Sequence, residues 1–121
     1  MEIAYVNIHV SDLARAVAFY RDTLGLSLAF QDAEHGYASF SAGPISMGMA
    51  VVGKDQTELL GVHTGIGFNV ADLEAEHARL VGLGVPFNMP PSRQPWGGFM
   101  ALMEDPDGNI FYLDEISAAH G

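Results

Sequence analysis

The sequence predicts an α+β fold in which a unit of one strand, one helix and three further strands occurs twice. An internal repeat carries this prediction, because the segment at 8–13 (IHVSDL) aligns with the segment at 68–73 (FNVADL). Within each copy, strand periodicity gives way to helical periodicity, which predicts the order of the first two elements. With 121 residues, the chain has the length of one ordinary domain.

The first copy begins with a predicted strand at residues 3–10. Its side chains alternate between two faces, one made of Val6, Ile8 and Val10 and the other of Tyr5, Asn7 and His9. Asp12 then stands where a helix N-cap belongs, and Gly25 supplies the left-handed residue that ends a helix. Apolar runs at 26–30, 37–41 and 45–52 predict the three strands that follow.

The second copy repeats this plan. Asp72 is the expected helix cap and Gly84 the expected stop, and strands are predicted at 86–89, 99–104 and 109–113. Residues 89–98 contain three prolines and are predicted to form a loop, which carries Trp96 and is able to act as a lid or rim over a binding site. We therefore place module one at about residues 1–53, a linker at about 54–61 and module two at about 62–117, within a single domain.

Composition and charge exclude several classes of function. The absence of cysteine removes disulfides, thiolate metal sites and cysteine nucleophiles. The net charge of −10 repels phosphate backbones and anionic lipid surfaces, so we expect no nucleic-acid partner and no membrane partner. No apolar run approaches the roughly 20 residues of a membrane helix, and Glu2 follows Met1 where a leader would be basic and then apolar. We expect a soluble, cytoplasmic protein.

Two motifs resemble one known family. Residues 10–26 (VSDLARAVAFYRDTLGL) resemble the opening of glyoxalase/bleomycin-resistance/extradiol-dioxygenase proteins, the vicinal oxygen chelate superfamily. Residues 104–109 (EDPDGN) look like the turn before that family's last strand. The resemblance implies two βαβββ modules that form a half-open mixed sheet around a cavity, often completed by a second chain in a homodimer.

The resemblance also implies where the family's enzymes hold a divalent metal, usually through His, Gln or Glu. The corresponding positions of this chain carry Tyr5, Met47, Gly65 and Tyr112. A phenol, a thioether and a missing side chain do not provide the nitrogen and carboxylate donors that such metals need. We therefore expect no metal and no cofactor.

Histidines offer an alternative metal set. His9 and His63 lie on or beside the predicted first strands, but each is displaced from the family's ligand position, in opposite directions along the strand. We expect them to line the cavity as hydrogen-bonded or solvated side chains. His35, His77 and His120 receive no role.

Rings and methyl groups then remain as the walls of the expected cavity. We expect Phe40 and Phe68 to belong to the core. The expected site has no catalytic residue, and its ligand-binding side chains are Tyr5, Asn7, His9, Met47, Trp96, Phe99 and Tyr112. Such a pocket suits a small aromatic or cationic organic molecule. The leading expectation, implied by the resemblance, is a metal-independent, homodimeric binding protein of the antibiotic-sequestering resistance type. The alternative is a glyoxalase-like lyase, isomerase or dioxygenase, either with a divalent metal at non-standard positions or with a metal-free acid/base reaction through His9, Tyr5 or Tyr112.

Overall fold

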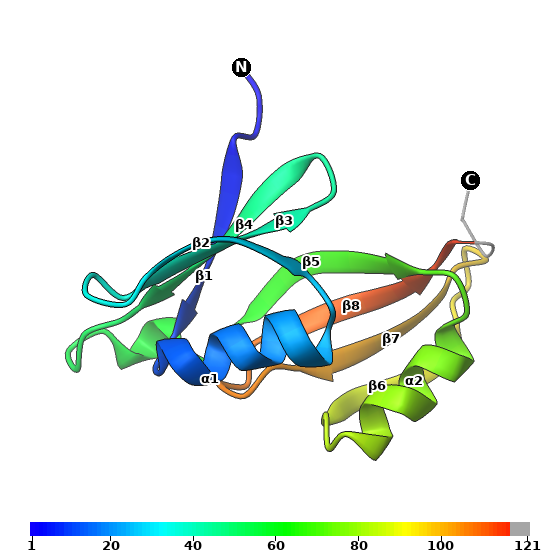
Figure 1. Cartoon of the computed structure of the whole chain (residues 1–121). Coiled ribbons are helices and arrows are strands. Elements are labelled where there is room, and N and C mark those ends of the chain that lie inside the picture. Colours follow the sequence, from blue (N-terminus) through cyan, green and yellow to red (C-terminus); the bar gives the residue numbers. More distant parts are fainter. Residues whose placement is uncertain (117–121) are drawn as a thin grey trace. The chain divides into compact units, whose positions relative to one another are not determined.

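The computed structural model describes residues 1–116 and shows two compact units, Met1–Gly61 and a second unit that begins at Val62 (Figure 1). Each unit holds one four-stranded mixed sheet and one main α-helix. The predicted α+β class and the repeated order of strand, helix and three strands are confirmed. Single-domain behaviour of the two modules stays a prediction, and residue 117, where module two was expected to end, lies outside the described residues.

The first sheet has the strand order β1-β4-β3-β2. Its strands are β1 (Tyr5–Val10), β2 (Ser27–Asp32), β3 (Tyr37–Ala42) and β4 (Ile45–Val51). β1 pairs with β4 in parallel, and the other pairs are antiparallel. Helix α1 (Leu13–Ala18) continues into a π-helical turn (Phe19–Thr23), and a short 3₁₀ helix (Thr57–Leu59) follows β4.

The second sheet repeats this topology with the order β5-β8-β7-β6. Its strands are β5 (His63–Val70), β6 (Phe87–Arg93), β7 (Phe99–Glu104) and β8 (Ile110–Glu115), and its helix is α2 (Leu73–Gly82). Again the first strand of the unit pairs in parallel with the last, β5 with β8. Among residues 1–116, no helix has the length and apolarity to cross a bilayer.

Both predicted helix caps are confirmed. The Asp12 carboxylate accepts a hydrogen bond of 3.0 Å from the Arg15 amide, and Asp72 accepts one of 3.1 Å from the Ala75 amide. A side chain of this kind satisfies a backbone donor that the first turn of a helix leaves without a partner. The two copies therefore start their helices by the same device.

Each helix covers one side of its own sheet, and the core of each unit lies between that helix and that sheet. In the first unit, strand side chains pack against Leu13, Ala16 and Val17 of α1, and the buried strand side chains are Ile8, Val10, Ala38, Phe40, Met47 and Met49. In the second unit, Ala101, Met103, Phe111 and Leu113 are buried on the α2 side. Phe40 is fully buried, as predicted, and the Phe68 ring lies 5.3 Å from the Phe111 ring.

Strand β6 corrects the prediction of a loop at residues 89–98. It continues through Pro90 and Pro91 to Arg93. Because β6 is an edge strand, one of the two prolines can face the free edge, where no ladder hydrogen bond is lost. The other faces β7, and the register shift between Met89 and Ser92 accommodates its missing N–H group. Only the segment at 94–98 remains as the turn between β6 and β7.

A buried carboxylate organises the turn between β7 and β8. Asp105 is 3% exposed and accepts hydrogen bonds of 2.9 Å each from the Asp107 amide, the Asn109 amide and the Asn109 side-chain amide. The Asn109 side-chain oxygen in turn accepts from the Val62 amide at 3.2 Å. Asp105 therefore has the structural role that its place in a tight turn predicts, and the turn is tied to the residue before β5.

We expect Asp105→Ala to lower the free energy of unfolding by about 2–4 kcal/mol, because three charge-assisted hydrogen bonds are lost together. Asp105→Asn keeps one acceptor oxygen and should lose less. Urea unfolding followed by circular dichroism measures both, with exposed Glu74→Ala as the control. Equal stability of Asp105→Ala and the control would show that the turn does not depend on this carboxylate.

Candidate functional site

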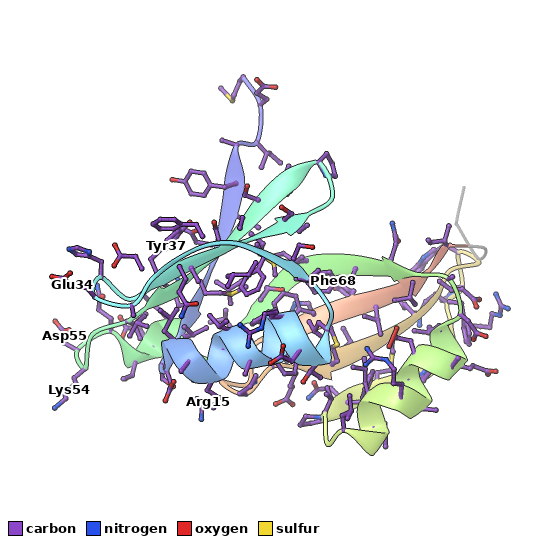
Figure 2. All side chains as sticks on the ribbon, viewed as in Figure 1. Arg15, Glu34, Tyr37, Lys54, Asp55 and Phe68 are labelled. Atoms are coloured by element: carbon purple, nitrogen blue, oxygen red, sulfur yellow. The ribbon has the colours of Figure 1, made fainter. Side chains whose placement is uncertain are left out.

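The side of the first sheet that faces away from α1 carries no helix of its own unit. We call it the first open face, and Figure 2 shows Tyr37 standing on it. By register, three of its four strands contribute side chains to this face: Tyr5, Asn7 and His9 from edge strand β1, Ser46, Gly48 and Ala50 from β4, and Tyr37, Ser39 and Ser41 from β3. Glycine, alanine and serine therefore occupy the middle of this face, between larger side chains.

Two aromatic rings stand at the edges of the first open face. Tyr5 on β1 is 59% exposed, and Phe30 on β2, which is opposite Ser39, is 55% exposed. Rings at this exposure keep most of their apolar area available to a ligand. The structure thus places Tyr5, Asn7 and His9 on one face of β1, as the alternation of side chains in the sequence predicted.

Met47 corrects part of the predicted site. It pairs with Val6 and Phe40, on the helix side of the sheet, and is 1% exposed. Met47 was predicted from its correspondence to a ligand position of the family, and a difference of one residue in that correspondence moves a side chain from one face of a strand to the other. Met47 belongs to the core and is not available to a ligand.

The second open face is the side of the second sheet away from α2. Tyr112 lies at its centre, between Gly67 of β5 and Leu102 of β7. The His63 ring lies 5.1 Å from the Tyr112 ring. Because the Gly65 amide donates to Nδ1 of His63 at 3.2 Å, the neutral imidazole carries its proton on Nε2.

Asp114 lies two residues beyond Tyr112 on the same strand and therefore on the same face. Its carboxylate folds over Gly67, in space that a larger residue there would fill. Among the residues that the structure describes, it has no hydrogen-bond or ion-pair partner. The two basic side chains of this unit are engaged elsewhere: Arg79 pairs with Glu76, and Arg93 lies 4.7 Å above the Phe99 ring.

Trp96 and Phe99 occupy different environments. Trp96 is 61% exposed at the tip of a tight turn that is closed by a hydrogen bond of 2.8 Å from the Gln94 amide to the Gly98 carbonyl. Phe99 shares the strand side of buried Ala101 and Met103, so it does not project from the second open face, contrary to the prediction. Trp96 stays available to a ligand, at the end of the sheet where β8 carries Asp114 opposite Met100.

The residues at the family's metal positions do not fit a divalent ion. Met47 is buried on the helix side, Gly65 has no side chain, and Tyr5 and Tyr112 offer neutral phenols. In residues 1–116, no three side chains of His, Cys, Asp or Glu come together in a way that could hold a metal.

The other histidines of the chain lie in different environments. His35 contacts Asp32 at 2.8 Å in a turn, and the His77 ring packs 4.5 Å from the Phe87 ring. His120 lies outside the described residues. His9 lies on the first open face opposite Ala50 and has further interactions there.

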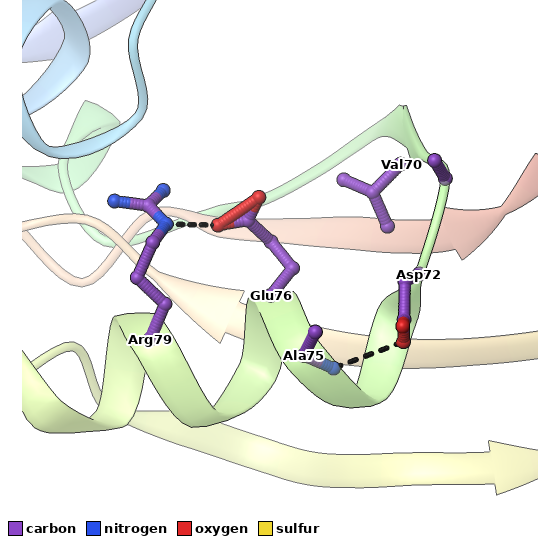
Figure 3. A pocket seen from close by; sticks show the side chains of 6 residues that line it. Val70, Asp72, Ala75, Glu76 and Arg79 are labelled. Atoms are coloured by element: carbon purple, nitrogen blue, oxygen red, sulfur yellow. Dashed lines mark hydrogen bonds and ion pairs between the residues drawn. The ribbon is translucent and has the colours of Figure 1, made fainter.

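An open hollow of about 290 Å³ lies beside the start of α2 (Figure 3). Its polar groups are already used, since Asp72 caps the helix and Glu76 pairs with Arg79. A polar ligand would have to break these contacts. We read the hollow as part of the helix start rather than as the functional site.

The two groups with shifted pKa values, Arg21 and Asp22, lie on the π-helical turn and not on the open faces. The hydrogen bond from Arg21 lowers the pKa of Asp22, and the same bond raises the pKa of Arg21. A lowered carboxyl pKa contributes stability that is present above the unfolded pKa and is lost as the pH falls. Both side chains are exposed and lie away from the open faces, so this pair has no bearing on ligand chemistry.

Residues 2–113 match the sequence profile of the Glyoxalase/Bleomycin resistance protein/Dioxygenase superfamily, and the chain belongs to this family. The Bacillus subtilis (strain 168) protein named Uncharacterized protein YraH is 28% identical over 124 residues, which cover 93% of this chain and 97% of that protein. The resemblance seen in the two sequence motifs is thereby confirmed.

Solved structures agree in fold. A superfamily member from Sphaerobacter thermophilus DSM 20745 has a TM-score of 0.80 at 26% identity, covering 95% of this chain and 97% of that one. TnmS3 from Streptomyces sp. CB03234, described as an antibiotic binding protein, has a TM-score of 0.76 at 30% identity and covers 95% of both chains. Proteins that bind antibiotics are thus among the relatives that share this fold.

We expect Met47→Ala to lower the free energy of unfolding by about 2–5 kcal/mol, because it leaves a cavity between the first sheet and α1. Tyr5→Ala, at an exposed position of the same sheet, should change it by less than about 0.5 kcal/mol. Urea unfolding compares the two variants. Stability losses in the reverse order would mean that the two faces are assigned the wrong way round.

Proposed function

We propose that this chain binds a small aromatic cation without a metal, as a homodimeric binding protein of the antibiotic-sequestering type. The observation that carries the proposal is the Asp114 carboxylate beside the Tyr112 ring on the second open face. A carboxylate and a ring face form complementary halves of a site for a flat, positively charged molecule. Glu104 adds a second acidic group on this face, held by a 2.7 Å hydrogen bond from Asn88.

The magnitudes favour a cation over a neutral ring. A cation above an aromatic face gains about 0.5–2 kcal/mol, and a partly exposed ion pair adds up to about 1 kcal/mol. A neutral ring of the same shape gains only the apolar contact. The charge preference should therefore amount to about tenfold in affinity.

Three further features support the proposal. The net charge of −10 attracts cations to the whole chain. Trp96 offers an exposed ring near the end of β8 that carries Asp114. Among the relatives, TnmS3 is described as an antibiotic binding protein at 30% identity.

Binding can be tested with two ring systems of one shape, the 10-methylacridinium cation and neutral 9-methylanthracene. We expect the cation to bind about tenfold more tightly in isothermal titration calorimetry. Because Trp96 is the chain's one tryptophan, quenching of tryptophan fluorescence during the titration is a signal of that ring alone and gives a second measure of binding. Equal affinity for both probes, or no binding of either, would contradict the proposal.

Asp114→Asn removes the charge while keeping the shape, and we expect it to weaken acridinium binding about fivefold and to leave methylanthracene unchanged. Glu74→Gln makes the same change of charge on the exposed surface of α2 and serves as the matched control. An equal effect of both variants would show that only overall charge matters. Light scattering measures whether the binding species is a dimer.

The enzymatic alternative makes a different prediction. A lyase, isomerase or dioxygenase with a metal at non-standard positions would carry a stoichiometric divalent ion after purification without a metal-affinity tag. We expect elemental analysis to find less than one-tenth of an equivalent, on the order of adventitious binding, because the donor set at the family's positions is poor. A full equivalent would replace the binding proposal with the enzymatic one.

A further inference from the structure

Gly48 is the meeting point of two polar side chains on the first open face. The Asn7 carbonyl oxygen and the Tyr37 hydroxyl both occupy the space that a Cβ at position 48 would need. The Tyr37 hydroxyl donates to the Asn7 oxygen at 3.5 Å, a long hydrogen bond that orients the amide more than it stabilises it. Glycine is thus the residue that lets Asn7 lie flat against the sheet.

This arrangement leaves one end of Asn7 available. An asparagine amide has an acceptor oxygen and a nitrogen with two donor hydrogens. The oxygen faces Gly48 and Tyr37, and within residues 1–116 the nitrogen has no hydrogen-bond acceptor. Asn7 is also exposed, so its donors reach solvent, where a ligand can replace the water.

Apart from His9, two residues along β1 on the same face, the neighbours of Asn7 are uncharged. Across the sheet, its row continues through Gly48, Ser39 and Phe30, and the adjacent row runs from Tyr5 through Ser46 and Ser41. The acidic side chain at the far edge, Asp32, is engaged with His35. A charged group placed here would lose hydration and meet no counter-charge, whereas a neutral acceptor would meet a donor.

We propose that Asn7, oriented by Tyr37 and admitted by Gly48, is a subsite for an uncharged carbonyl oxygen carried by a flat aromatic ligand. The Asn7 nitrogen donates to that oxygen, the Tyr5 ring contacts the apolar part of the ligand, and Tyr37 acts as a positioning residue. The inference rests on the proposed binding of small aromatic molecules and names a chemical group that the ligand presents. It assigns roles to Tyr37 and Gly48 in addition to the contact at Asn7.

The subsite can be tested with ketones and the hydrocarbon or ether analogues that lack only the carbonyl oxygen: xanthone with xanthene, and fluorenone with fluorene. We expect each ketone to bind about threefold to tenfold more tightly, the worth of one neutral hydrogen bond. In ¹⁵N-correlated NMR spectra, the Asn7 side-chain amide should shift with the ketones and stay in place with their analogues.

Three variants separate the roles. Asn7→Asp is isosteric but has no donor, so the ketone preference should vanish while the analogues still bind. Gly48→Ala pushes the ends of two flexible side chains aside and should reduce the preference with the fold intact. Gly82→Ala, where a Cβ meets nothing within 4 Å, is the matched control and should keep the preference.

The outcomes distinguish this inference from the proposed function. Equal binding of ketones and analogues, or a preference that survives Asn7→Asp, overturns the subsite while cation binding at Asp114 stands. Failure of all four probes to bind also overturns the subsite, and the methylacridinium titration then decides separately whether the proposed function survives.

Discussion

Burial of one side of each sheet against its own helix is the constraint on which the other features depend. Because successive side chains of a strand point to opposite faces, fixing Ile8 and Val10 against α1 also fixes Asn7 and His9 on the other side. The same holds in the second unit, where buried Phe111 and Leu113 place Tyr112 and Asp114 on the open face. The chemistry of the open faces is therefore a consequence of how the core is packed.

The sequence predicted those elements whose signals are local. The Asp12 and Asp72 caps, the repeated order of elements and the structural role of Asp105 all depend on residues within a few positions of one another. Met47 and Phe99 were expected at the ligand from a correspondence to family positions and from proximity to the Trp96 turn, and neither signal fixes the face of the strand on which a side chain lies. Pro90 and Pro91 misled for another reason, since only the strand order shows that β6 is an edge.

The contacts that give the candidate site its chemistry are mostly between strands. Tyr37 reaches Asn7 across β4, and Asp114 covers Gly67 of the neighbouring strand. A single sequence does not show which residues are paired across a sheet, so these neighbours were not predicted. Asp114 was missed in particular because the predicted last strand ended at residue 113, whereas β8 continues to Glu115 and so places Asp114 on the same face as Tyr112.

The two prolines of β6 also affect what the second sheet can join. An exposed edge strand normally offers a row of N–H and C=O groups that another chain can pair with, which is how sheets fuse into aggregates. Because successive N–H groups of a strand point to opposite sides, one of the two consecutive prolines removes a donor from this edge, and the neighbouring register shifts bend it. Pro90 and Pro91, which predict a loop when the sequence is considered alone, therefore protect the sheet against uncontrolled polymerisation at β6.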